Sequence, residues 1–441
     1  MAHSQHFSAA SYPPTYRQLE VQPIVAAIRG HWSIVISGLA GAGKSHLMRF
    51  LASNEAFKAH YFGKDNTNLT FVFVDCNLMD ERDEQGFYQG LIATLGQQCT
   101  LIGHVDLQGA TDVELVLALK QYLDGLYREQ LTVVFVLDRF EKFYQSGRLS
   151  YILDNLRYLR DHFARHISYI LAVRGETDIT STSEEFEDLL YSPAIIYLKP
   201  LTPADAQDSI ARYEREYDTT FDREEKRKLI SYTGGYPRLL QTVCDLAREG
   251  RVDLGADDAE IVRKLSDAPQ IQNACRKIWE GLTSKDRAIL RLVALGISTL
   301  KDDSLPVRYG LVHTVPGSQP RIFCPLFETF VRENQDLNFT LQLVPPNKVL
   351  RGTDVIQLAP LETNFLACLL EDPGQVCLYD DIIAQVYPKA TAAEGVSPQA
   401  LAGLAKRVRR KINLPGYNLI ENVRGIGYLL NLAPGTARKQ R

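Results

Sequence analysis

The feature that most constrains this chain is the run at residues 38–45, GLAGAGKS, which lies between an apolar segment and a stretch with helical spacing. Its pattern, GxxxxGK[ST], requires a strand before it and a helix after it, so that backbone N–H groups and the helix N-terminus surround phosphate oxygens. The apolar run 32–37 is the expected strand, and residues 46–52 continue the expected helix. The motif therefore predicts a nucleoside triphosphate site, for ATP (or ADP) with Mg²⁺.

Each residue of the motif has an expected role. Lys44 would reach the β- and γ-phosphates, and the Ser45 hydroxyl would bind Mg²⁺. The loop backbone and the first helical turn would hold the remaining phosphate oxygens. The other expected nucleotide contacts in this segment are Gly38, Gly41, Gly43 and His46.

A second strand-end motif would complete such a site. The apolar run 131–138 ends at Asp138, which we expect to hold Mg²⁺ beside the nucleotide. Glu141 is the expected base that polarises the attacking water, and Arg174, at the end of the run 167–174, is expected to face the γ-phosphate. A surface carboxylate and a surface salt bridge are the respective alternatives for Glu141 and Arg174.

Strands and helices alternate over the first 200 residues. Each predicted strand is a nearly continuous apolar run, which is typical of a parallel sheet covered by helices on both faces. The predicted strands are residues 32–37, 69–75, 131–138, 167–174 and 194–198. Residues 203–265 are helical throughout, except at the GGYP sequence 234–237. We therefore expect an α/β P-loop NTPase core with an α-helical lid.

Three short sequences give this part of the chain a family resemblance. Residues 138–141 (DRFE) are similar to the Asp-x-Phe-Glu Walker B signature of STAND-type signalling ATPases, relatives of the AAA+ group. Residues 16–17 (YR) look like the entry segment that packs near the adenine, and residues 235–237 (GYP) resemble the GxP motif of the STAND lid. The resemblance covers about residues 12–265.

The resemblance implies that Pro237 and Arg238 lie close to the nucleotide, although an exposed arginine at a helix start is an alternative for Arg238. The sequence departs from the AAA+ pattern in one respect, because Arg139 rather than an acid follows Asp138. If Glu141 does not substitute for that acid, hydrolysis is slow or absent while binding persists. We therefore expect an ATPase with slow or regulated turnover.

A basic amphipathic segment lies near the C-terminus. Residues 361–371, 379–386 and 397–412 are expected helices, and the last has an apolar stripe that would bury one face and leave a basic face free. A solvated charged face is the alternative to contact with a polyanion. The cations of the last helix are Lys406, Arg407, Arg409, Arg410 and Lys411.

The strands expected around residues 417–421 and 428–432 flank a second resemblance. Residues 421–428 (ENVRGIGY) resemble the TVRGxGY wing of OmpR/PhoB-type winged-helix transcription regulators, and residues 408–412 (VRRKI) look like the end of that family's recognition helix. The likeness covers about residues 338–432. It implies a helix in the DNA major groove, with Arg424 reaching toward the minor groove or its phosphates.

Composition excludes other classes of protein. The chain has 441 residues and a net charge of −4, but its last 45 residues carry nine basic residues against Glu421 alone. The seven cysteines contain no CxxC pair, which argues against a structural zinc site. The sequence contains no apolar segment long enough to span a membrane. We expect a cytoplasmic protein, and the acidic stretch 181–188 is expected to be a solvated loop.

Together these patterns predict four parts. They are a P-loop ATPase core (1–200), a helical lid (201–266), a linking winged helix that serves for packing (267–337) and a C-terminal DNA-binding winged helix (338–441). The expected function is a nucleotide-switched transcription regulator that binds double-stranded DNA, with assembly into a homo-oligomer as one effect of ATP. An ATP-dependent assembly or defence protein, or a mobile-element or DNA-loading ATPase recruited to DNA, is the alternative.

Overall fold

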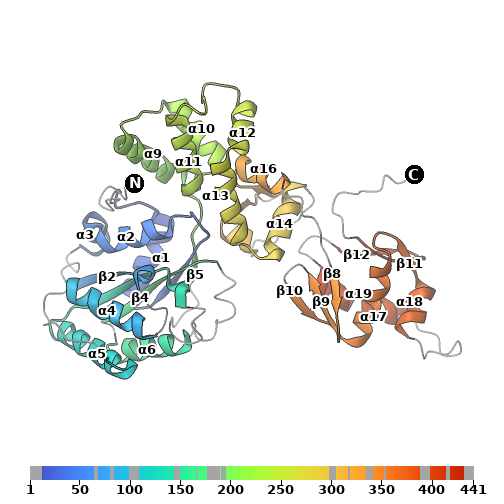
Figure 1. Cartoon of the computed structure of the whole chain (residues 1–441), viewed down its shortest axis with the longest axis horizontal. Helices are drawn as coiled ribbons and strands as arrows, with labels where there is room; N and C mark the ends of the chain where they lie inside the picture. Colours follow the sequence, from blue (N-terminus) through green and yellow to red (C-terminus); the bar gives the residue numbers. More distant parts are fainter. Residues whose placement is uncertain are drawn as a thin grey trace. The chain divides into compact units, whose positions relative to one another are not determined.

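The computed structural model of the chain divides into two compact units, Met1–Gly281 and Leu282–Arg441 (Figure 1). It describes residues 12–63, 68–79, 84–98, 109–143, 149–164, 166–175, 189, 195–296, 304–315, 318–333, 341–351, 354–387, 398–413 and 418–431. Within these ranges no helix is both long enough and apolar enough to cross a bilayer. The expected acidic loop 181–188 and the C-terminal residues 432–441 lie outside the described residues.

The first unit contains a five-stranded parallel sheet with the order β2-β3-β4-β1-β5. Every residue of β4 and all but the first of β3 are buried, as expected for strands that are covered on both faces. The predicted parallel α/β core is therefore confirmed. Its strands are β1 (Ile34–Ser37), β2 (Leu69–Asp75), β3 (Thr132–Asp138), β4 (Ile167–Val173) and β5 (Ile195–Tyr197).

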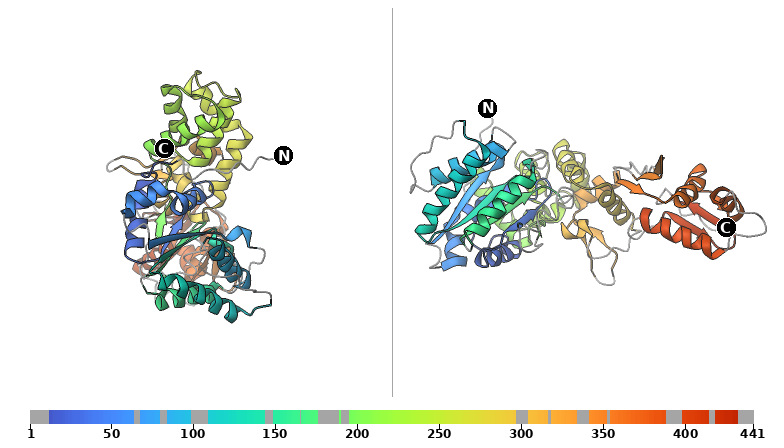
Figure 2. Two further views of the ribbon diagram at one scale, coloured as in Figure 1. Left: turned by 90° about the vertical axis from the view of Figure 1, so that its left-hand side faces the viewer. Right: turned by 90° about the horizontal axis from the view of Figure 1, so that it is seen from below.

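Helices on the two sides of the sheet bury different faces of the strands. Helices α4, α5 and α6 form one apolar cluster with strand residues such as Phe135 and Leu171, whereas α2 contacts the same strands from the other side (Figures 1 and 2). The short helix α3, which Asn54 caps, was not expected from the sequence. The helices are α1 (Gln18–Arg29), α2 (Lys44–Ser53), α3 (Glu55–Phe62), α4 (Glu84–Gln98), α5 (Asp112–Arg128) and α6 (Leu149–His162).

Five helices follow β5 within the same unit and include the predicted lid. Thr202 caps α9 by accepting a hydrogen bond from the Asp205 N–H, and Asp222 and Glu225 form a capping box at α10. These local signals explain why the helices begin where they do. The helices are α9 (Pro203–Tyr217), α10 (Arg223–Thr233), α11 (Pro237–Arg248), α12 (Asp258–Asp267) and α13 (Pro269–Glu280).

The turn between α10 and α11 joins the lid to the end of β5. Gly235 has a φ of 73°, and its carbonyl accepts a hydrogen bond from the Leu201 N–H at 3.0 Å. A Cβ on Gly235 would lie 2.5 Å from the Leu201 carbonyl oxygen. Only glycine fits this turn, which fixes the start of α11 and therefore the position of Pro237.

The second unit begins with three helices and the predicted hairpin. Strands β6 (Val312–His313) and β7 (Arg321–Ile322) pair antiparallel, and Pro316 and Gly317 at its expected tip lie outside the described residues. The helices are α14 (Ser284–Ala294), α15 (Leu305–Arg308) and α16 (Pro325–Glu333). The four predicted domain boundaries remain predictions.

The remainder of the unit is a winged helix that contains two antiparallel sheets, as predicted for the C-terminal part. The β8–β10 sheet was not expected, although the expected turn at Pro345-Pro346 joins its first two strands. Helices α17 and α19 pack against each other around a common apolar core. The elements are β8 (Leu341–Val344), β9 (Lys348–Arg351), β10 (Asp354–Gln357), α17 (Pro360–Glu371), β11 (Val376–Leu378), α18 (Tyr379–Val386), α19 (Pro398–Ile412), β12 (Ile420–Val423) and β13 (Gly427–Leu430).

Alanine at position 235 should destabilise the first unit more than alanine at a matched glycine. Gly250 is the control, because its φ is 69° but an added Cβ would meet nothing within 4 Å. A left-handed backbone costs an alanine roughly 1–2 kcal/mol at either site. The contact with Leu201 should add about 1–3 kcal/mol to the cost of Gly235→Ala. Thermal unfolding measures the difference, and equal losses in melting temperature would contradict the packing argument.

Candidate functional site

The P-loop turns tightly into the N-terminus of α2. Gly41 and Gly43 have φ angles of 82° and 95°, which favour glycine. A Cβ on Gly41 would also lie 2.6 Å from the Cβ of Arg238, so the neighbouring lid helix leaves no room for a side chain. The loop therefore has the glycine-dependent shape of a phosphate-binding turn.

The Lys44 side chain folds back onto its own loop. Its ammonium donates hydrogen bonds to the carbonyl oxygens of Gly38 and, at 3.4 Å, of Leu39. Burial lowers the pKa of Lys44 to about 8, an effect that the charge of Glu141 opposes. A phosphate beside this ammonium would favour its charged form, because an opposite charge at short distance raises the pKa of a cation.

Two carboxylates lie at the end of β3 and in the 3₁₀ helix Phe140–Phe143 that follows. Asp138 is fully buried, and neither of its carboxylate oxygens accepts a hydrogen bond of good geometry among the described residues, although the neighbouring Ser45 hydroxyl is close enough to lower its pKa against the effect of burial; Oε2 of Glu141 also lacks a partner there. Burial raises the pKa of both carboxyl groups. Unpartnered buried carboxylate oxygens are costly in a protein interior, and they are suitable ligands for Mg²⁺ or its waters.

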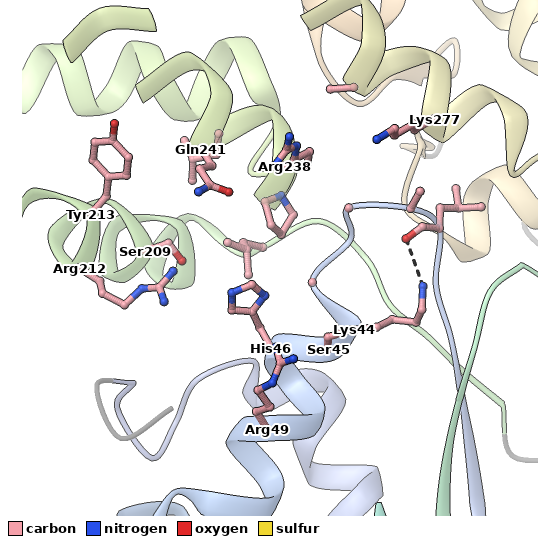
Figure 3. A pocket seen from close by; sticks show the side chains of 18 of the residues that line it. Lys44, Ser45, His46, Arg49, Ser209, Arg212, Tyr213, Arg238, Gln241 and Lys277 are labelled. Carbon is pink, nitrogen blue, oxygen red and sulfur yellow. Dashed lines mark hydrogen bonds between the residues drawn. The ribbon is translucent and has the colours of Figure 1, made fainter. Parts of the chain in front are cut away.

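Most of the predicted site residues line one cavity of about 620 Å³ (Figure 3). Gly38 and Asp138 are buried behind its wall and do not line it. Among the described residues, no three His, Cys, Asp or Glu side chains are grouped so that they could hold a metal ion by themselves. A cation here would depend on phosphate oxygens as well as protein. The predicted residues in the cavity wall are Gly41, Gly43, Lys44, Ser45, His46, Glu141, Arg174, Pro237 and Arg238.

Further cavity residues escaped the sequence analysis. Arg49 lies one helical turn beyond Ser45, so its spacing could have identified it. Arg212 on α9 and Lys277 on α13 belong to no motif and required the fold. The cations of the cavity wall are Lys44, Arg49, Arg139, Lys142, Arg174, Arg212, Arg238 and Lys277, against the acids Glu141 and Glu216. This charge balance favours a polyanionic ligand.

An aromatic cluster lines the cavity next to Arg212. The rings of Tyr12 and Tyr16 stack with centroids 4.1 Å apart, and the Arg212 guanidinium lies 4.6 Å from the Tyr12 centroid. Burial, with the charges of Arg212 and Arg49, lowers the pKa of His46 to about 4. His46 is therefore neutral at pH 7, which suits contact with an uncharged part of a ligand.

Hydrogen bonds tie the P-loop to the lid and to the entry segment. The Tyr236 hydroxyl donates to the Ala40 carbonyl at 2.8 Å, and the Arg238 N–H donates to that of Gly41 at 3.2 Å. The Arg17 guanidinium donates to the Ala42 carbonyl at 2.6 Å. Three successive P-loop carbonyls thus accept bonds from outside the loop.

A second candidate site is the basic helix α19, several of whose cations bond within the domain. Lys411 donates to the buried Glu362 carboxylate at 2.6 Å, and Arg407 lies 3.8 Å from its other oxygen. Arg409 donates to the Ile420 carbonyl at 2.9 Å and lies over the Tyr428 ring. These contacts position β12, β13 and α17 against α19.

Four of the predicted cations are exposed, and one of them, Arg407, forms the long ion pair with Glu362; the other three have no such partner among the described residues. Lys406 and Arg410 are one turn apart on α19, and Arg424 lies in the turn between β12 and β13. No hydrogen bond or ion pair holds any of them within the described part of the chain. These side chains are free to contact phosphates.

Two family models match separate parts of the chain. A model of the AAA domain matches residues 28–180, and a model described as the C-terminal part of transcriptional regulatory proteins matches residues 352–430. A comparison with curated proteins gave no match.

Solved structures resemble the chain at low identity. A Walker-type ATPase of Pyrococcus abyssi is 16% identical and covers 73% of this chain and 98% of its own, with a TM-score of 0.46. The C-terminal domain of the nisin resistance regulator, a lantibiotic response regulator, is 26% identical and covers 21% and 93%, with a TM-score of 0.19. The Orc1 protein of Aeropyrum pernix, solved in complex with DNA, is 13% identical and covers 74% and 94%, with a TM-score of 0.40.

Replacing Glu362 by glutamine should weaken the C-terminal winged helix at neutral pH. Although burial alone would raise the pKa of Glu362, the Ala359 N–H and the charges of Lys411 and Arg407 outweigh it and lower the pKa. A lowered folded-state pKa stabilises the domain above the unfolded value of about 4.3, and this contribution disappears as pH falls through the folded-state value.

We expect Glu362→Gln to cost about 1–3 kcal/mol at pH 7, as is typical when a buried charge-assisted hydrogen bond is lost. The difference from wild type should shrink below pH 4. The control is Glu371→Gln, an exposed position on the same helix. Melting curves of the full-length variants at pH 7 and pH 3.5 measure both effects, and a pH-independent difference would contradict the electrostatic account.

Proposed function

Because the chain joins an AAA-type P-loop ATPase domain to a winged-helix domain of the transcriptional-regulator type, we propose that it is a nucleotide-switched transcription regulator. The observation that carries this proposal is one cavity in which Lys44, Ser45 and Glu141 face lid residues of the same unit. A ligand bound there contacts core and lid together. The DRFE and GYP sequences support assigning the ATPase to the STAND group.

In this proposal the cavity binds ATP with Mg²⁺. Lys44 exchanges its loop carbonyls for β- and γ-phosphate oxygens, and Ser45 and Asp138 hold the metal ion, which neutralises phosphate charge. The unpartnered oxygens of Asp138 support this role. The aromatic end, with Tyr12 and Tyr16, supplies apolar surface for a base.

Hydrolysis would be slow or regulated. Glu141 would accept a proton from the attacking water, for which its raised pKa is favourable, and Arg174 would stabilise charge on the transferred phosphoryl group. Arg139, in place of an acid after Asp138, adds a positive charge to the cavity wall. The long-lived state in this proposal is the nucleotide-bound one.

The DNA-binding role rests on the exposed cations of α19 and the wing. Lys406 and Arg410 are exposed and unpaired within the described residues, while Arg409 and Lys411 are engaged within the domain and the exposed Arg407 is paired with Glu362 at 3.8 Å. We therefore narrow the proposed phosphate contacts of the helix to Lys406 and Arg410, with Arg424 from the wing. ATP would act on these contacts by changing how the ATPase unit restrains or assembles the DNA-binding unit.

Two variants should separate nucleotide binding from hydrolysis. Lys44→Ala should abolish ATP binding by calorimetry, because it removes the cation that meets the phosphates. Glu141→Gln should keep binding but lose about 10²–10⁴-fold in turnover, the usual contribution of a general base. Lys58→Ala, which removes a lysine outside the cavity, is the control. If Lys44→Ala binds ATP as wild type does, the nucleotide site is wrong.

Removing Lys406 and Arg410 together should reduce the salt dependence of duplex DNA binding. If both contact phosphate, the slope of log K against log salt should fall by up to about two units. The charge-matched control is Arg332→Ala with Lys348→Ala, two exposed cations elsewhere in the same unit. Fluorescence anisotropy over a salt series measures the slopes. Equal slopes for the two double variants would remove this face of α19 from the interface.

A further inference from the structure

Helix α13 closes the cavity over the P-loop. Ala274 and Lys277 of this helix line the cavity. Gly281, directly after the helix, packs on Leu39 of the P-loop so closely that an added Cβ would lie 3.2 Å from Leu39 Cδ2. Positions 274, 277 and 281 are three and four residues apart and therefore share one helix face. That face lies against the tip of the P-loop.

The end of the cavity that α13 closes is the phosphate end. The Lys44 ammonium lies between the carbonyls of Gly38 and Leu39, and in this motif the lysine reaches the β- and γ-phosphates. The base end is formed by Tyr12 and by Arg212 of α9. In Figure 3, Lys277 lies on the same side as Lys44 and Arg238, whereas Arg212 and Tyr213 lie on the opposite side.

The Lys277 charge is available to a ligand. The side chain is exposed, and no hydrogen bond or ion pair engages it in the described part of the chain. It shares the cavity wall with Lys44, Arg174 and Arg238, so it adds a like charge to a site that is already cationic. Like charges repel one another, and an additional phosphate between these cations would attract each of them and so offset the repulsion.

We infer that Lys277 contacts the nucleotide and binds the terminal phosphate of a triphosphate. This inference rests on the proposed nucleotide site and adds a residue from outside the P-loop, Walker B and lid motifs. A diphosphate lacks the group that Lys277 binds, so this residue favours the triphosphate over the diphosphate. Helix α13 ends at Glu280, next to the boundary between the two compact units.

The test compares a non-hydrolysable triphosphate, AMP-PNP, with ADP on the full-length protein by calorimetry. Lys277→Ala should lower the affinity for AMP-PNP about tenfold, the value of one good charge-assisted contact, and the affinity for ADP less than twofold. Lys277→Arg should retain most of the discrimination. Arg276→Ala is the matched control, because this exposed neighbour on α13 does not line the cavity.

The outcomes separate this inference from the proposed function. Normal ADP binding by Lys277→Ala shows that the variant is folded, so a selective loss of AMP-PNP affinity supports the inference. Equal losses for both nucleotides, or no loss, overturn it while the nucleotide site stands. If wild type binds neither nucleotide, the proposed site and the inference both fall. A selective loss in Arg276→Ala of the same size would assign the effect to the charge of the helix and overturn the role of Lys277.

Discussion

The buried guanidinium of Arg17 holds together the segments from which the cavity is built. Its side chain is 1% exposed and donates hydrogen bonds to the Ala42 carbonyl of the P-loop and the Lys199 carbonyl after β5. Its backbone N–H donates to the Asp205 carboxylate at the start of the lid, at 2.9 Å. A buried charge is costly unless it is paired and hydrogen-bonded, and Arg17 is paired with Glu20 at 3.2 Å, although its Nε has no hydrogen-bond partner among the described residues. Separating these segments would leave the buried cation without its remaining acceptors. Core and lid are therefore coupled before any nucleotide binds.

The cavity has both an excess of positive charge in its wall and buried carboxylate oxygens that lack a partner among the described residues. Its wall is mostly cationic, which raises the affinity for phosphates, while buried carboxylate oxygens of Asp138 lie just behind that wall without a partner. An anion alone would satisfy Lys44 but not Asp138, and a metal ion alone would satisfy Asp138 but not the cations. A phosphate chain that carries a divalent ion answers both requirements at once. The desolvated, unpartnered carboxylate oxygens at this site are thus features of a binding site rather than of a rigid core.

The sequence predicted the elements whose signals are local. Continuous apolar runs located the strands, as for β3, and the glycine pattern located the turn before Lys44, because periodicity and backbone conformation depend on neighbouring residues only. What it missed depends on contacts across the fold. No residue close to Lys277 in the sequence indicates that its helix lies on the P-loop. Likewise, no residue close to Arg409 in the sequence indicates that its guanidinium donates a hydrogen bond to the carbonyl of Ile420 in a later strand. The likeness to known wings located Arg424, but only the fold could divide the cations of α19 into exposed and engaged ones.

The exposed face of α19 has a consequence for how such a domain would choose its DNA. Between the buried Leu401 and Leu404, the outward positions are Ala402 and Gly403, which have no side-chain donor or acceptor for base edges. One turn further on, Lys406 and Arg410 are suited to contact the phosphate backbone of the duplex rather than its bases. Apart from Gln399, which is exposed in the first turn of the helix, this face offers little to base edges, and preference among sites would follow the width and stiffness of the grooves, with runs of A·T pairs favoured for their narrow minor groove next to Arg424. Its target sites would share groove width and flexibility of the DNA, and an alignment of those sites would show little consensus in base sequence.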